Sequence, residues 1–435
     1  MFGRCVVLAA LLAAFILSPI TDALAGGPEA AAPPKERTQM LGDWGGTRTS
    51  LAAHGIIVDL RLTQYEQWVA SGGVNQNDEY GGTMDYRINA DLKKLFGLWG
   101  GLSVNMHART RWGDDVNADA GALVLPNTAL MMPAPGNYKG TNVTGLTVTQ
   151  MFPLYEGHLG SVTVGMLDAI DLVTGFFPHI GYGQEGFSNV NALVSAMPWF
   201  GSVQGLSLYG GMAVSINEKY KSPESGVLFA GTANNSTSWG SLSKNFDDGV
   251  FLAGFHRFFW DLDDKMGYFM VFAGGSTKDQ ASNDPHDFVV IPGQGIKSTE
   301  RKKPWDVALY VYQDIWQAQA NPNRKVSVFV GGTVGPDNPQ FSNWNIFGTL
   351  EAFGLRASRP HDRMGVAAWY NGLSPNFKIL VSPVASLRDT SGAEIYYNFA
   401  ITPWAHLTAD LQFVQNQNKG NDIAVIPGGR LVVDF

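Results

Sequence analysis

The feature that most constrains this chain is a period-two alternation of apolar and polar residues, which recurs in segments of about ten residues from Ile56 onward. A helix would bring residues three or four positions apart onto one face, so alternation predicts strands with one apolar and one polar face. Residues 83–93 are a clear case: the apolar residues are Met84, Tyr86, Ile88, Ala90 and Leu92, and Asp85, Arg87, Asn89 and Asp91 lie between them.

The lengths of the connections between these segments favour a transmembrane antiparallel β-barrel of sixteen strands over a soluble sandwich. Connections after even-numbered strands are short, such as 261–265 and 403–405, whereas several after odd-numbered strands are long and polar, such as 113–142, 217–247 and 277–304. Short periplasmic turns, long extracellular loops and an even strand number are typical of bacterial outer-membrane barrels. The sixth strand is included mainly to keep this parity. The predicted strands are 56–70, 83–94, 101–112, 143–152, 159–168, 187–198, 205–216, 248–260, 266–276, 305–316, 325–335, 344–356, 363–373, 391–402, 406–416 and 423–435.

The N-terminus predicts export. A short basic region ends at Arg4, the apolar run Val6–Leu17 follows, and Ala23-Leu24-Ala25 supplies small residues for cleavage, so we expect a signal peptide over residues 1–25. The apolar run is shorter than the roughly 20 residues of a spanning helix. The single cysteine, Cys5, would leave with this peptide, which excludes disulfides and cysteine-based chemistry in the mature chain.

No later segment reaches the length of a transmembrane helix, so an exported chain of this kind is periplasmic, secreted or a closed barrel. We expect a periplasmic N-terminal segment with a short helix over residues 26–55, capped by Thr47, and a barrel over 56–435. Trp44 is expected to anchor this segment against the barrel mouth. The terminal aromatic Phe435 resembles the signal that barrel-assembly machinery recognises. The net charge of −8 argues against nucleic acid as a partner.

The polar face of each strand should line the interior, which in a sixteen-stranded barrel is wide enough for water. Arginines from three consecutive strands would form one basic wall, with carboxylates nearly opposite. Together with aromatic faces, these groups would favour neutral polyols; the alternative is that the charges only solvate the wall and pair with one another. The residues predicted to line the pore and contact solute are Arg61, Asp85, Arg87, His107, Arg109, Arg111, Tyr209, Glu351, Trp369, Glu394 and Asp410.

The third outer loop, near residues 171–186, is a candidate constriction. Its apolar stretch is unusual for a solvated surface loop, although the same aromatics would also suit the membrane-interface girdle. The loop 113–142 is a second candidate lid. The residues predicted to form the constriction are Asp171, Phe176, Phe177, His179 and Glu185.

Short motifs stand at both ends of the chain. They are LGDWGGTR at 41–48 with Leu51 and HGI at 54–56, GG at 81–82 with Asp85, LKKLFGLWGG at 92–101, EIYY at 394–397, ITPW at 401–404, DLQF at 410–413 and PGGR at 427–430. These stretches resemble the carbohydrate-selective outer-membrane porins, the OprB family. One departure is QNQNKG at 415–420, where the family usually has an Asn-Pro-Gly turn.

The resemblance implies a channel that conducts glucose and related sugars by facilitated diffusion, without a cofactor or energy coupling. Its partners would be small carbohydrates, outer-membrane lipid, lipopolysaccharide and the barrel-assembly machinery. The resemblance leaves undecided whether the chain forms a homo-oligomer. A porin for organic anions or general solutes is the main rival.

An enzyme is less well supported, because the histidines are scattered and no serine stands in a GxSxG elbow. A periplasmic binding protein would show helical periods between its strands. No metal motif is evident: His286 and His361 lie in polar loops without a second ligand at helical spacing.

Overall fold

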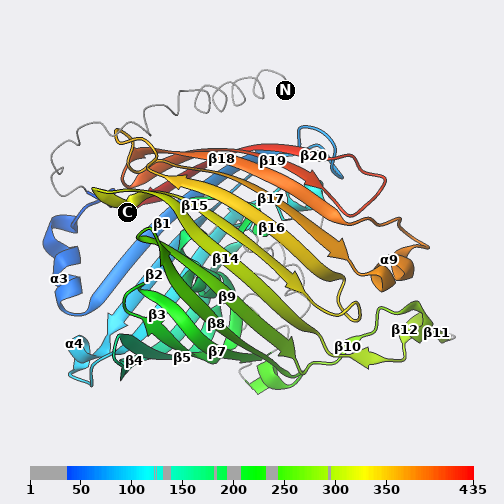
Figure 1. Ribbon diagram of the computed structural model, residues 1–435, viewed down its shortest axis with the longest axis horizontal. Helices are drawn as coiled ribbons and strands as arrows, with labels where there is room; N and C mark the ends of the chain where they lie inside the picture. Colours follow the sequence, from blue (N-terminus) through cyan, green and yellow to red (C-terminus); the bar gives the residue numbers. More distant parts are fainter. Residues whose placement is uncertain are drawn as a thin grey trace.

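The computed structural model describes residues 37–121, 123, 125–130, 139–180, 184–193, 207–231, 243–291 and 295–435. Its main sheet is a closed antiparallel barrel of sixteen strands, in which each strand pairs with its neighbours in chain order and the last pairs with the first (Figure 1). The predicted fold class is therefore confirmed. The barrel strands are β1 (Ile56–Trp68), β2 (Asp78–Asp91), β3 (Leu102–Gly113), β4 (Gly140–Tyr155), β5 (His158–Asp168), β6 (Ser207–Asn217), β7 (Ser222–Gly231), β8 (Val250–Leu262), β9 (Lys265–Ser276), β14 (Trp305–Ala318), β15 (Asn321–Val334), β16 (Ser342–Phe353), β17 (Arg363–Leu373), β18 (Thr390–Thr402), β19 (Ala405–Gln415) and β20 (Ala424–Asp434).

The remaining elements lie at the two ends of the barrel or inside it. Helices α3 and α4 share one end with the C-terminus, whereas α9 and the hairpin β11–β12 lie at the opposite end (Figure 1). No described helix is long and apolar enough to cross a membrane. These elements are η1 (Trp44–Gly46), α3 (Thr47–Ala53), α4 (Leu92–Phe96), α5 (Asn117–Ala120), α6 (Ala169–Phe176), η2 (Pro178–Ile180), α7 (Val190–Leu193), η3 (Ser243–Phe246), β10 (Gln280–Ala281), η4 (Pro285–Asp287), β11 (Phe288–Ile291), β12 (Gly295–Ser298), β13 (Arg301–Lys302) and α9 (Pro375–Val381).

The predicted sixth strand, 187–198, is wrong. Residues 190–193 form helix α7, and residues 194–198 lie outside the described part of the chain. Phe187, Val190 and Leu193 are apolar because they are buried inside the barrel. The missing strand is β7, which falls within the predicted loop 217–247. Its first residues, SPESG, have the composition of a turn, and the ladder to β6 shifts register beside Pro223.

The alternation of side chains along each strand separates an outer from an inner face. Outward residues such as Val164, Leu309 and Val366 are exposed, as expected for positions that face lipid. Large aromatic side chains mark the ends of this apolar band: Trp305 and Tyr370 lie at the end with the long loops, and Tyr155 lies at the end with the short turns. The outer face therefore has the girdled apolar surface of an outer-membrane barrel.

The N-terminal segment docks on the last strand. Helix α3 begins at Thr47 rather than being capped by it, and Asp43 Oδ1 accepts hydrogen bonds from the backbone and side chain of Thr49. Arg48 lies over the Trp44 ring at 4.4 Å and donates a 2.7 Å hydrogen bond to the carbonyl of Phe435. Trp44 thus packs against Arg48, and Arg48 in turn binds the N-terminal segment to the end of the chain.

A cation on the outward face should destabilise the barrel. Val311, at mid-strand in β14, is 41% exposed and pairs with Val330 and Phe269. We expect Val311→Arg to lower the free energy of unfolding in lipid vesicles by about 2–4 kcal/mol, measured by urea titration, because the guanidinium must enter hydrocarbon. Val384→Arg is the matched control, since Val384 is 87% exposed after α9. Equal effects of both substitutions would contradict the assignment of the lipid face.

Candidate functional site

Ten of the eleven predicted pore residues have side chains on the inner face of the barrel. Their neighbours in sequence face outward, so they lie on the face that period-two alternation predicts, and their contact with solute stays a prediction. Arg61 and Arg87 are partly exposed, whereas eight are almost completely buried. These eight are Asp85, His107, Arg109, Arg111, Glu351, Trp369, Glu394 and Asp410.

Tyr209 is the exception, and its prediction is wrong. Leu208 and Val214 of β6 belong to the interior apolar cluster and Met212 packs against it, which leaves Tyr209 on the outward face with partial exposure. The rule that the polar side faces inward fails here because the interior beside β6 is itself apolar.

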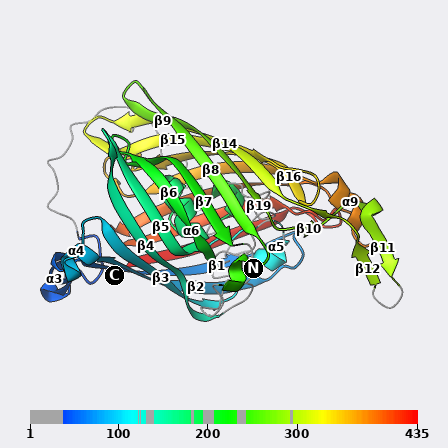
Figure 2. The same cartoon turned by 90° about the horizontal axis from the view of Figure 1, so that it is seen from below.

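The apolar part of the interior is built around the third outer loop, which folds into the barrel. Helix α6 of this loop is seen between β5 and β7 in Figure 2. Phe176 makes an edge contact with Phe255 at 4.8 Å, and Phe177 lies 5.0 Å from Tyr310 and 5.4 Å from Phe329. These aromatics therefore pack inside the barrel and do not belong to the interface girdle.

Buried polar groups from several strands hold this inward loop. Glu394 of β18 accepts hydrogen bonds from the amides of Ser188 at 2.5 Å and Asn189 at 2.9 Å. Arg430 of β20 donates to the carbonyl of Gly186 at 2.7 Å and to Ser188 Oγ at 2.8 Å. The loop backbone thus satisfies charges that would otherwise be buried without partners.

Three more arginines reach the loop. Arg61 pairs with Glu185 at 2.5 Å, and Arg363 donates to the carbonyl of His179. Arg257 of β8 donates to the carbonyl of Phe176 at 2.6 Å, and its guanidinium lies 4.6 Å from the Tyr268 ring. Sequence reasoning missed Arg257, although a lone arginine within the strand VFLAGFHRFFWDL was the available signal.

The predicted basic wall is largely neutralised. Arg109 pairs with Asp85 at 2.6 Å, and Arg111 pairs with Asp115 at 2.7 Å. Arg61 forms a two-point contact with Asp434 at 2.6 and 2.9 Å. The alternative interpretation, in which interior charges pair with one another, describes these residues better.

Part of the loop between β3 and β4 also lies inside. Asn127 donates to Gln67 of β1 at 2.7 Å, and Gln412 of β19 donates to the carbonyl of Pro126 at 3.0 Å. Thr128 donates from its amide to the carbonyl of Ser188, which joins this loop to the inward loop, described over residues 169–180 and 184–193. The described part of the second candidate lid around residues 126–128 is therefore inside the barrel, while residues 122, 124 and 131–138 of this loop lie outside the described chain.

Below the inward loop, on the side of the short turns, lies a cavity of about 480 Å³. One side carries polar groups of both signs, and the other is formed by apolar side chains of α6 and β6. The polar lining includes Asp59, Arg87, Asn89, Asn105 and Thr147, and the apolar lining includes Leu172, Phe176, Met212, Val214 and Ile216. A second space of about 300 Å³, nearer the chain end, shares Asp59 and Arg87 with it.

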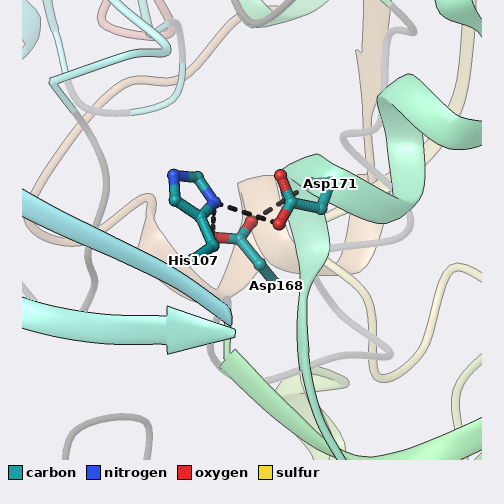
Figure 3. Close-up of side chains that lie close together, drawn as sticks. All are labelled: His107, Asp168 and Asp171. Atoms are coloured by element: carbon teal, nitrogen blue, oxygen red, sulfur yellow. Dashed lines mark hydrogen bonds and ion pairs between the residues drawn. The ribbon is translucent and has the colours of Figure 1, made fainter. Parts of the chain in front are cut away.

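His107 connects the barrel wall to α6 at the edge of this cavity. Its Nε2 lies 2.9 Å from Asp85. Its Nδ1 lies 3.0 Å from Asp171 and 3.6 Å from Asp168 (Figure 3). Asp171 is thus both a predicted loop residue and a partner of a predicted pore residue.

Two titratable groups of the loop have displaced pKa values. The Arg61 guanidinium lowers the pKa of Glu185 to about 2, so Glu185 is an anion at neutral pH. Burial, reinforced by Arg363, holds the pKa of His179 well below its usual range, and its ring is neutral.

Removing a loop contact should widen the channel. In Arg430→Met, the hydrogen bonds to Gly186 and Ser188 are lost, and each bond to a charged group contributes about 1.5–3 kcal/mol. We expect a larger single-channel conductance in planar bilayers. Arg359→Met is the control, because Arg359 pairs with Asp362 in a short turn away from the loop. An unchanged conductance of correctly folded Arg430→Met would contradict the role of this contact.

Comparisons with known proteins agree with this architecture. In the high-pH structure of Pseudomonas putida OprB, the match has a TM-score of 0.77 and 18% identity over 93% of this chain and 100% of that chain. The low-pH structure of the same protein gives a TM-score of 0.54 and 16% identity over the same shares. No curated protein matches the chain. The family model of the carbohydrate-selective porins, OprB family, matches residues 75–435, and the chain therefore belongs to this family.

Proposed function

We propose that this porin lets small neutral carbohydrates, such as glucose and related hexoses, diffuse across the outer membrane into the periplasm. Membership of the carbohydrate-selective family and the barrel fold indicate an outer-membrane channel rather than an enzyme. The observation that carries the choice of solute is the two-sided lining of the cavity below the inward loop.

A pyranose ring matches such a lining. Its hydroxyl groups both donate and accept hydrogen bonds, and Arg87, Asp59 and the two amides Asn89 and Asn105 offer donors and acceptors in the same space. Its less polar ring face suits the apolar side around Phe176. The volume falls within the range of roughly 300–1,000 Å³ that holds small ligands.

The pairing of the interior arginines makes a porin for organic anions the weaker candidate. A path for anions needs cations that are free to face the solute, whereas Arg61, Arg109 and Arg111 each contact a carboxylate. Passage of a neutral polyol requires only exchange of hydrogen bonds with the wall and water.

The solute preference can be measured by liposome swelling. We expect hexoses to enter vesicles containing the purified porin faster than charged solutes of similar mass, because they desolvate at lower cost and match both sides of the cavity. Equal rates for all solutes of similar mass would contradict the proposed preference for sugars and would indicate a general porin.

A variant of the cavity tests the same proposal. Arg87→Ala should reduce the advantage of hexoses over neutral solutes without vicinal hydroxyls by about twofold or more, since one charged hydrogen-bonding group is lost. Lys139→Ala removes an equal charge from an exposed pair with Asp114 outside the barrel interior, and should leave the ranking unchanged. An identical ranking in both variants would argue against solute contact at Arg87.

A further inference from the structure

We propose that His107, Asp168 and Asp171 form a binding site for a divalent transition-metal cation of the Zn²⁺ class, at the junction between the barrel wall and the inward loop. One imidazole nitrogen and two carboxylate oxygens of these residues lie within 4.8 Å of one another. Figure 3 shows the two carboxylates directed toward the same edge of the ring. The three ligands line the same cavity as the proposed solute contacts, but none of them is among the residues argued to contact the solute.

The spacing of the ligand atoms suits a small cation. His107 Nδ1 lies 3.0 Å from Asp171 Oδ2 and 3.6 Å from Asp168 Oδ2. In a tetrahedral site with bonds of 2.0–2.1 Å, neighbouring ligand atoms are about 3.3 Å apart. The two carboxylate oxygens lie within 4.8 Å of each other, so side-chain adjustments would bring all three atoms to bonding distance.

Two carboxylate oxygens of the cluster lack other partners. Asp168 is 3% exposed; its Oδ1 caps helix α6 through the amides of Ile170 and Asp171, while its Oδ2 accepts no hydrogen bond. Asp171 Oδ1 is also buried without a hydrogen bond. The ion pairs of both carboxylates are with His107. Such oxygens gain from a cation that coordinates them.

The far side of the imidazole has the support that metal-bound histidines usually have. His107 Nε2 lies 2.9 Å from Asp85 Oδ1, and Asp85 is held in turn by Arg109 at 2.6 Å and by Gln184 at 2.8 Å. This carboxylate accepts a hydrogen bond from Nε2–H and orients the ring so that Nδ1 faces the metal position, where its lone pair can bind once the Nδ1 proton has left. The arrangement is the carboxylate–histidine–metal relay, with the metal position lying between β3 and α6.

The cavity beside the cluster gives a cation a route in and space for water ligands, since His107, Asp168 and Asp171 all line it. Three protein ligands with a remaining open position suit Zn²⁺ and similar ions, whereas Ca²⁺ requires six to eight oxygen ligands. On binding, the cation takes the place of the proton on Nδ1. It would then cross-link the inward loop to the wall, through Asp171 of α6 on one side and Asp168 at the end of β5 and His107 of β3 on the other.

The test uses tag-free porin purified in detergent and stripped with EDTA. Equilibrium dialysis against ZnCl₂ with elemental analysis should give one Zn²⁺ per chain, and Co²⁺ substitution should give the visible absorption of a nitrogen- and oxygen-ligated ion. Asp168→Asn and Asp171→Asn should each weaken Zn²⁺ binding by about tenfold or more. Asparagine still caps a helix, so Asp168→Asn retains the start of α6.

His158→Gln is the control, because His158 pairs with Glu224 near a short turn outside the cluster. It should bind Zn²⁺ as the parent protein does. Retention of heat-dependent gel mobility would confirm that each variant is folded. The absence of stoichiometric Zn²⁺ in the parent protein, or equal affinity in folded Asp168→Asn, Asp171→Asn and the parent, would overturn the site.

Discussion

A charged side chain inside this barrel is covered by the protein's own loops, and it must find a partner there because it has lost its water. Most of the architecture follows from that constraint. The inner face carries Arg61, Arg109, Arg363 and Arg430, and each contacts a carboxylate or a backbone carbonyl. The inward loop supplies many of these partners. The inward loop and the interior charges thus form one network, in which the loop is held in place by the charged side chains and these side chains find their partners in the loop.

The network occupies only part of the wall. From β8 to β15 the inner face is mainly aromatic, and Phe176 and Phe177 of the loop pack into it. One side of the loop is therefore held by dispersion and apolar burial and the other by hydrogen bonds and ion pairs. Arg257 bridges the two, since its guanidinium lies over Tyr268 and binds the carbonyl of Phe176. This division also gives the cavity its apolar and polar sides, from which the proposed preference for sugars derives.

Much of the fold could be predicted from the sequence because lipid and water impose opposite demands on alternate residues of a strand. That rule placed fifteen of the sixteen barrel strands. The predicted strand 187–198 has no counterpart in the barrel, and β7 is the strand that it missed. It also placed ten of the predicted pore residues on the inner face. It failed at Tyr209, where both faces of β6 meet apolar surroundings, and at 187–198, where apolar residues belong to the filled interior. The period-two pattern shows which residues are apolar, but it does not distinguish an apolar residue that faces lipid from one that packs inside the protein.

By itself, the sequence determined that the chain forms strands with two unlike faces, that these strands close in a ring, and that charges line the inside. These properties depend on residues near one another in the chain and on the medium they face. The tertiary structure alone decided which interior charges are paired, how the third loop is held, and that His107 meets Asp168 and Asp171. Glu394 and the amide of Ser188, for example, come from distant parts of the chain. Their contact depends on where the closed ring brings β18 and the loop together, and no local pattern encodes that distance.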